Sequence, residues 1–180
     1  MKLFSKKIVL LAAVLAVSFI GANAQSRSND QRPLSVQIEK KILNMPYYEV
    51  FDHISFDIQG STVYLSGKVL NGMNKSMAEN IVEDLPGVEK VVNNIEILSG
   101  SSLDSRIRGE VLRSIANRGG LARYVSSTRP SVRIIVDRGR ISLEGYVAST
   151  SDANALNVLA NGASGAFGVT NNLIVDKDRL

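Results

Sequence analysis

The sequence predicts an α+β protein made of two tandem αββαβ units, each a three-stranded mixed sheet packed against two helices. The main observation is an internal repeat, because VYLSGKV at residues 63–69 is answered by ISLEGYV at residues 141–147, 78 positions later. This offset holds without a gap over residues 54–97. Apolar residues alternate within the repeated stretches and recur at helical spacing around them, as expected for strands and helices.

Each unit begins with an amphipathic stretch. Apolar residues recur there every three or four positions, which places them on one face of a helix. They are Leu34, Ile38, Ile42 and Met45 in the first unit, and Leu103, Ile107, Val111 and Ile115 in the second. We therefore expect a helix in front of each hairpin, with this stripe facing the sheet.

A hairpin follows in each unit. The first strand alternates at Ile54, Phe56 and Ile58, matched by Val132, Ile134 and Val136, and the second at Val63, Leu65, Gly67 and Val69, matched by Ile141, Leu143, Gly145 and Val147. The intervening turns contain Gly60 and Gly139. Because Gly67 and Gly145 lie in phase with the apolar residues, we expect either close approach of a helix backbone or a β-bulge there.

A second helix and a closing strand complete each unit. Asn71 and Ser149 are the expected helix caps. The buried stripe is predicted at Met77, Ile81 and Leu85 in the first copy and at Ala155, Leu159 and Ala163 in the second. The closing strands follow Gly87 and Gly165 and contain Asn93 and Asn171 in phase with apolar neighbours. We interpret both asparagines as structural hydrogen-bonding residues and not as ligands.

The first residues predict a signal peptide. Lys2, Lys6 and Lys7 precede an apolar run at residues 8–20, which ends at the small-residue site Ala22-Asn23-Ala24. The run has thirteen residues, fewer than the roughly 18 to 20 that a membrane-spanning helix needs, so an uncleaved anchor is the alternative. The chain contains no cysteine, which excludes disulfides and attachment of lipid to an N-terminal cysteine. We expect a soluble, exported and periplasmic protein.

The predicted boundaries follow from composition and from the repeat. The signal peptide covers residues 1–24 and a polar lead-in covers residues 25–33. The first repeat spans residues 34–98, a Ser/Gly-rich linker residues 99–102, and the second repeat residues 103–176, before a tail at residues 177–180.

The residue inventory argues against an enzyme. The chain has one histidine, His53, without an acid or a nucleophile at a motif spacing around it. It has no glycine-rich phosphate loop, no cluster of metal-ligand residues and no serine elbow. We therefore expect a non-enzymatic protein with no metal and no cofactor.

The paired pattern Gly-x-x-Val-x-Leu-x-Gly-x-Val followed by Gly-Val-x-x-Val-x-Asn resembles the BON domain (bacterial OsmY and nodulation domain). The first copy matches at Gly60, Val63, Leu65, Gly67, Val69, Gly87, Val88, Val91 and Asn93. The second matches at Gly145, Val147, Gly165, Val169 and Asn171, and departs at Ile141 and Ala166. The resemblance implies a periplasmic protein of osmotic or envelope stress that attaches to phospholipid surfaces. It supplies no invariant binding residue.

Charge distribution is the remaining guide to a ligand. Residues 25–98 contain 7 Lys and Arg against 10 Asp and Glu, a net charge of −3, whereas residues 99–180 contain 11 against 7, a net of +4. Arginine forks match phosphate oxygens, and an aromatic side chain can anchor in a membrane interface. We therefore expect anionic phospholipid to bind the second repeat, through candidate residues on its first helix and in the loop that follows. These are Arg106, Arg113, Arg118, Arg123 and Tyr124.

Three alternatives compete with lipid binding. Arginines scattered on a solvated helix are also ordinary protein surface, and Asp104 and Glu110 dilute the patch. A nucleic-acid backbone would suit the arginines as well, but export argues against it. A module that docks envelope proteins through its polar sheet faces is the third alternative, and its binding would be insensitive to lipid.

Overall fold

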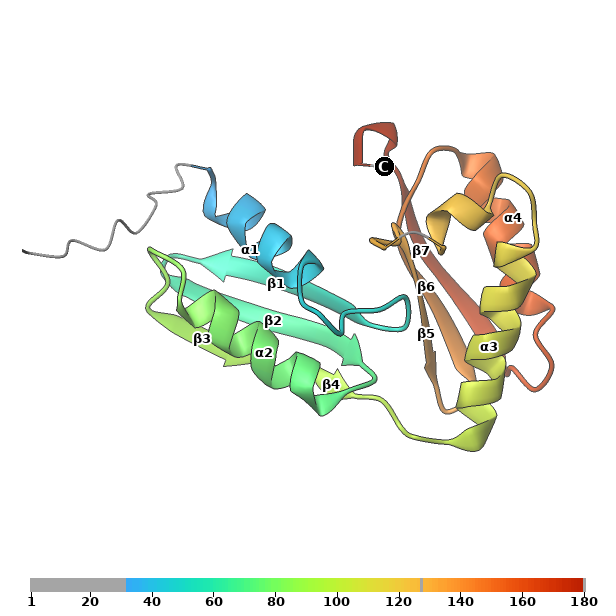
Figure 1. The fold of residues 1–180 in the computed structure, drawn as a ribbon, viewed down its shortest axis with the longest axis horizontal. Helices are drawn as coiled ribbons and strands as arrows, with labels where there is room; N and C mark the ends of the chain where they lie inside the picture. Colours follow the sequence, from blue (N-terminus) through green and yellow to red (C-terminus); the bar gives the residue numbers. More distant parts are fainter. Residues whose placement is uncertain (1–31, 127, 180) are drawn as a thin grey trace, which may run out of the picture. The chain divides into compact units, whose positions relative to one another are not determined.

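The computed structural model describes residues 32–126 and 128–179, so the predicted signal peptide and most of the lead-in lie outside the described residues. The first repeat contains α1 (Leu34–Leu43), β1 (His53–Gln59), β2 (Thr62–Val69), α2 (Gly72–Glu83), β3 (Lys90–Asn93) and β4 (Glu96–Ile97) (Figure 1). The second contains α3 (Ser102–Ala116), the 3-10 turn η1 (Ala122–Tyr124), β5 (Val132–Asp137), β6 (Arg140–Val147), α4 (Thr150–Asn161) and β7 (Gly168–Val175), followed by η2 (Lys177–Arg179). The predicted α+β fold with two tandem units is confirmed.

Both sheets have the same mixed topology. β1 runs antiparallel to β2, and the closing strands β3 and β4 run parallel to β2. In the second repeat β5 runs antiparallel to β6, and β7 runs parallel to β6. The registers correspond, because Ile58 faces Val63 in one hairpin and Val136 faces Ile141 in the other. Figure 1 shows α3 and α4 side by side over one face of the β5–β6–β7 sheet.

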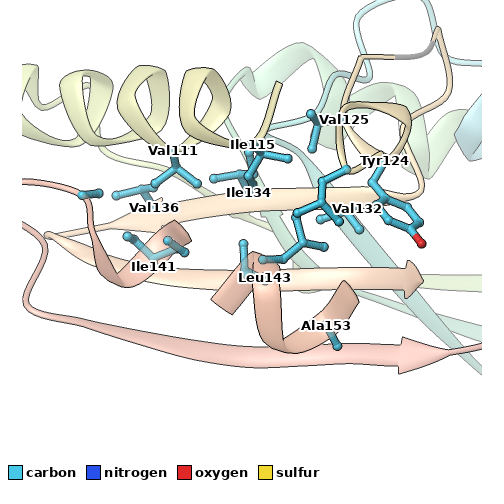
Figure 2. Packing of buried hydrophobic residues seen from close by; sticks show 14 of the residues in the cluster. Val111, Ile115, Tyr124, Val125, Val132, Ile134, Val136, Ile141, Leu143 and Ala153 are labelled. Carbon is cyan, nitrogen blue, oxygen red and sulfur yellow. The ribbon is translucent and has the colours of Figure 1, made fainter. Parts of the chain in front are cut away.

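The alternating strand residues form the two cores, as predicted. Val63, Leu65 and Leu143 are fully buried and Ile141 is 1% exposed. In the second repeat these side chains meet the stripe of α3, and Figure 2 shows Val111 and Ile115 over the sheet residues Ile134 and Val136. Burying an aliphatic side chain of this size stabilises the fold by about 1.5 to 3 kcal/mol. The two cores therefore need no disulfide.

The second helix of each repeat begins at the predicted cap but buries a different stripe. Asn71 and Ser149 accept hydrogen bonds from backbone N–H groups of the first turns of α2 and α4. Of the predicted stripe, Leu85 and Ala163 are buried, at 6% and 7% exposure. Within the helices the buried residues are Asn74, Ala78 and Val82 in α2 and Ala153, Leu156 and Ala160 in α4, not Met77, Ile81, Ala155 and Leu159. These last four residues are half-buried at the flank, because a shift of one residue turns a helix by about 100° within a broad apolar arc.

Gly67 and Gly145 are required by the neighbouring strand, not by a helix. Their φ angles are 120° and 109°, a region that other residues rarely adopt. A Cβ atom on Gly67 would lie 2.2 Å from the carbonyl oxygen of His53, and one on Gly145 would lie 2.0 Å from that of Ser131. The expectation of a close helix approach is therefore wrong. A bulge is also absent, because the strand register runs through both glycines without an extra residue.

The closing strand of the first repeat is divided, which was not predicted. β3 ends at Asn93 and β4 begins at Glu96, although the N–H of Asn94 still donates to the carbonyl of Leu65 at 2.8 Å, whereas β7 pairs with β6 along its whole length. Ile95 turns into the core and is 1% exposed, while its counterpart Leu173 is only half-buried. The gain from burying Ile95 accounts for the interruption.

The two repeats contact each other within one compact unit that begins at Arg32. The N–H of Ile134 on β5 donates to the carbonyl of Val50 at 2.8 Å, so the loop before β1 pairs with the outer edge of β5. Lys68 donates to Asp137 across the same boundary at 2.5 Å. β5 is consequently buried on both faces, although its second face was expected to be polar.

This ion pair makes a testable prediction about pH. The hydrogen bond from Lys68 holds the pKa of the Asp137 carboxyl below its ordinary value of 3.8. A depressed folded-state pKa means that the stabilisation is present above pH 4 and is lost as the pH falls through the lower folded value. Carboxyl titration by NMR should show this depression in the parent protein and its loss in Lys68→Met, whereas Lys75→Met should leave it unchanged. If the pKa of Asp137 is the same in the parent protein and in Lys68→Met, the predicted contact between the repeats is contradicted.

Candidate functional site

Three of the predicted arginines lie exposed along α3 and the turn after it. Arg106 and Arg113 are seven residues apart, so they lie on the same face with about 10 Å between them along the helix axis. The Arg113 guanidinium reaches over Gly109, with Nη1 4.0 Å from the position of a Cβ atom there. Arg118 is exposed just beyond the helix end. Their positive charge is available to a ligand on this face.

Arg123 and Tyr124 do not join that face. Tyr124 is 1% exposed; its hydroxyl donates to Asp152 at 2.7 Å and accepts from the N–H of Ala148 at 3.0 Å. Figure 2 shows its ring beside Val132 in the core of the second repeat. Arg123 lies over the same ring at 4.7 Å and pairs with Asp152 at 3.2 Å. The expectation of Tyr124 as an interfacial anchor is therefore corrected, because the loop folds inward as η1.

Arg108, on the same helix, is also not a surface residue. It is 3% exposed and donates from Nη2 to the carbonyl of Val136 at 2.6 Å. Its Nε and Nη1 atoms are buried without a hydrogen-bond partner among the described residues. Burial lowers the pKa of this guanidinium, and Asp104 provides the largest opposing effect. Arg108 therefore belongs to the interior.

Phe167 is an exposed aromatic residue that the sequence interpretation missed. It is 72% exposed, more than any other large hydrophobic side chain among the described residues. Its N–H donates to the carbonyl of Gly139 at 2.8 Å, and its ring lies on that glycine, 2.6 Å from the position of a Cβ atom. The ring is thus held at the turn between β5 and β6, where it faces water.

Three exposed arginines lie at or near the two turns that hold this aromatic side chain. Arg138 and Arg140 flank Gly139 and are exposed. Arg106 reaches the turn before β7, with Nη2 3.3 Å from the position of a Cβ atom on Gly165. Two carboxylates lie at this turn. Asp137 pairs with Lys68, and Asp104 is 1% exposed and accepts from the N–H groups of Arg138 and Gly139. We call Arg106, Arg138, Arg140 and Phe167 the basic tip.

The repeat offset gives a comparison that distinguishes the basic tip from its counterpart. Phe167 and Gly139 correspond to Glu89 and Ser61 in the first repeat. There the Ser61 hydroxyl donates to the Glu89 carboxylate at 2.7 Å. The same corner of the fold is therefore acidic and polar in one repeat, and aromatic and basic in the other.

Comparison with known proteins identifies the fold family. The family model for the BON domain matches the chain twice, at residues 30–99 and 103–177. The chain belongs to the BON domain family. We refer to these two regions as BON domain 1 and BON domain 2.

Matches to individual proteins are distant. Two solved structures of CdsD, a structural protein of the type III secretion system of Chlamydia trachomatis, resemble the two BON domains. One is its C-terminal domain, with 17% identity, 82% of this chain and 99% of that chain covered, and a TM-score of 0.29. The other has 14% identity, 81% and 94% coverage, and a TM-score of 0.31. No curated protein matches the chain, and we draw no functional conclusion from CdsD.

The framework residues of both BON domains have structural roles. Asn93 donates to the carbonyl of Lys75 at 3.0 Å and accepts from the N–H of Ile95 at 3.2 Å. Asn171 makes the equivalent bonds to Ala153 and Leu173, both at 3.2 Å. The closing strand is thereby tied to the second helix of each domain. Gly87 and Gly165 lie in the turns that lead into these strands.

His53 is half-buried at the start of β1; burial lowers its pKa, Glu144 raises it and Arg133 lowers it. Among residues 32–126 and 128–179 there is no group of three side chains that could hold a metal ion. In the same part of the chain no helix is long and apolar enough to cross a membrane.

Proposed function

We propose that this protein is a non-enzymatic, exported protein of the bacterial envelope that binds anionic phospholipid surfaces through BON domain 2. The basic tip is the observation that carries the proposal. It combines the most exposed large hydrophobic side chain of the described residues with three exposed arginines at one end of one domain. The predicted leader peptide supports export.

The chemistry of the basic tip suits a headgroup layer. Arginine binds phosphate oxygens through two parallel N–H donors, and each base near an anionic leaflet contributes about 1 kcal/mol. Phe167 would enter the boundary between headgroups and acyl chains, where an apolar ring gains from leaving water. Arg113 and Arg118 extend the positive surface along α3. Attachment through a tip of this size is reversible and weakens with salt.

BON domain 1 provides an internal contrast. Its corresponding corner carries Glu89 and Ser61, and the charge of residues 25–98 is −3. Anionic lipid would be repelled at that corner, and no aromatic ring is presented there. We therefore assign lipid contact to BON domain 2, with BON domain 1 as its structural support.

The alternative is a module that docks envelope proteins without contacting lipid. One observation favours it, because exposed apolar side chains gather at the start of α2. Met73 and Ile97 are 52% and 57% exposed, and the Ile97 side chain lies 3.3 Å from the position of a Cβ atom on Gly72. Binding of this kind would persist at high salt and in the absence of vesicles.

Sedimentation with vesicles tests the lipid proposal. The mature chain should pellet with vesicles of phosphatidylglycerol and phosphatidylcholine, and far less with phosphatidylcholine alone. Phe167→Ala and Arg106→Glu should each weaken binding about tenfold, because each loses about 1.4 kcal/mol of interfacial interaction. Binding by the parent should also fall as salt is raised.

Two matched variants serve as controls for this assay. Val158→Ala removes another exposed apolar side chain, on α4, and Lys90→Glu reverses an exposed charge on BON domain 1. Both should bind like the parent. If Phe167→Ala and Arg106→Glu bind as well as these controls do, the basic tip is not the lipid site.

A further inference from the structure

A groove of about 650 Å³ lies beside α1 and β1 of BON domain 1, and residues 129–131, 133, 145 and 146 of BON domain 2 complete its lining. On one side, Ser35, Val36, Glu39, Ile42 and Leu43 line it, and this spacing is that of one helix face. On the other side, the four consecutive residues 53–56 line it. Successive side chains of a strand point to opposite faces, so a groove that touches four in a row follows the edge of the strand.

The strand at this groove is the edge strand of its sheet. The sheet order is β1-β2-β3, and β1 pairs with β2 alone. The outer edge of such a strand presents backbone N–H and C=O groups. Opposite this edge, Val36 and Leu43 of α1 are 40% and 37% exposed. A partly exposed apolar helix face beside an edge strand is suited to an extended peptide that adds one strand to the sheet.

In BON domain 2 the corresponding edge, that of β5, is paired with a backbone segment. There the N–H of Ile134 on β5 donates to the carbonyl of Val50, which comes from the loop before β1. By the repeat offset, Ile134 corresponds to Phe56 on β1. Outside the β1–β2 ladder, Phe56 makes no backbone hydrogen bond within the described residues. In BON domain 2 this edge is therefore paired with a backbone, whereas on β1 the N–H of Ile54 donates to the Tyr48 hydroxyl at 2.9 Å and the edge lacks a backbone partner at Phe56 among the described residues.

Positive charge is concentrated at one end of the groove. Arg133 lines it and is 5% exposed; its guanidinium lies 4.4 Å above the ring of Tyr48, and Nη1 donates to the carbonyl of Glu49 at 2.8 Å. Arg129 is exposed and bonds to the side chain of Asn44, just after α1. Glu39, in the middle of α1, adds one carboxylate to the lining. Arg129 and Arg133 outnumber it, so the end of the groove near His53 keeps a net positive charge.

We propose that this groove binds the C-terminal segment of a partner protein, an extended peptide that ends in an apolar residue and a free carboxylate. The carboxylate would lie near Arg129 and Arg133, because the end of α1 and the start of β1 meet there. From that end the peptide would run antiparallel to β1 towards Phe56. Four residues of strand span about 13 Å, which sets the recognised length at about four residues. This site is distinct from the basic tip.

A pool of randomised peptides tests the proposal and selects the preferred sequence at the same time. The full mature chain is immobilised and incubated with hexapeptides randomised at the last four positions, as free acids and as C-terminal amides. Recovered peptides should end in apolar residues, and the free acids should be enriched at least tenfold over the amides. A selected peptide should also slow hydrogen exchange at the amide of Phe56.

Variants separate the groove from the lipid site. Val36→Glu and Arg129→Glu should each weaken the selected peptide at least tenfold, whereas Val158→Glu on α4 should have no effect. Phe167→Ala should retain peptide binding in full. The proposal is overturned if no peptide is recovered, if acids and amides bind equally, or if decanoate binds the groove while no peptide does, since that result would indicate a fatty-acid site.

Discussion

Gly145→Ala is expected to lower the free energy of unfolding by about 4 kcal/mol, a large part of the roughly 5 to 15 kcal/mol that native proteins have. The added Cβ atom would lie 2.0 Å from the carbonyl oxygen of Ser131, and the φ angle of 109° is strained for alanine. Such a backbone conformation costs about 1 to 3 kcal/mol, and forced repacking costs a similar amount. The strand cannot retreat, because Gly145 also pairs with Leu173 of β7.

Chemical denaturation of matched variants measures this effect. Gly168→Ala is the control in the neighbouring strand, because its Cβ position has open space and its φ angle is ordinary. It should change the free energy of unfolding by less than about 1 kcal/mol, since alanine also lowers the entropy of the unfolded chain. Gly67→Ala should resemble Gly145→Ala, since its Cβ atom would lie 2.2 Å from the carbonyl of His53. Equal stability of Gly145→Ala and Gly168→Ala would refute this account of the hairpin.

The spacing of apolar residues correctly predicted the strands and the buried face of α3. Residues such as Leu65 and Leu143 alternate with polar neighbours, and burial of one strand face follows from that alternation alone. The stripe of α3 was equally predictable, because Ile107 and Val111 stand out from charged neighbours. In α2 and α4 the apolar residues are spread over a wider arc of the helix surface. Which of Met77 and Ala78 faces the sheet then depends on side-chain size at the contact, which spacing does not encode.

Periodicity does not apply to loops, and the candidate site depends on loops. Tyr124 is buried because Ala148 and Asp152, more than twenty residues away, provide partners for its hydroxyl. No local pattern contains that information. Phe167 lies in a turn, where neither helical nor strand spacing predicts exposure. A comparison of the two copies at the 78-residue offset could have found it, because aromatic Phe167 replaces acidic Glu89 and Gly139 replaces Ser61.

The groove shows a third limit of sequence interpretation. Part of its lining comes from α1 and β1, which were predicted, but the rest, including the positive charge of Arg129 and Arg133, comes from BON domain 2. The contacts that bring the domains together include a backbone hydrogen bond between Val50 and Ile134 and the bond from Arg133 to the carbonyl of Glu49. Backbone hydrogen bonds do not depend on which side chains the residues carry. The sequence pattern therefore predicts the fold of each repeat but not the contacts between the two repeats.

Removal of the Asp104 side chain is expected to lower the free energy of unfolding strongly, whereas removal of the Arg108 side chain is expected to change it little. Asp104→Ala should lower the free energy of unfolding by about 3 to 5 kcal/mol. The buried carboxylate accepts from Gly139 at 2.7 Å and from Arg138 at 3.0 Å, and its loss leaves these donors unpaired. The change also removes the carboxylate that most favours the charged form of Arg108, which is 3% exposed. A buried charge without compensation is strongly destabilising.

Arg108→Met should change stability by no more than about 1 kcal/mol, even though it removes a buried charge. The guanidinium donates to Val136, but two of its nitrogens have no partner among the described residues, so its desolvation is poorly compensated. Methionine fills the same volume without that cost. Asp104→Ala should then cost less in the Arg108→Met background than alone, because no buried cation remains to be stranded. Glu110→Ala, on the exposed side of α3, is the control and should cost under about 1 kcal/mol. If Arg108→Met destabilises as much as Asp104→Ala in urea titrations, the buried guanidinium stabilises the fold and this explanation of its environment is wrong.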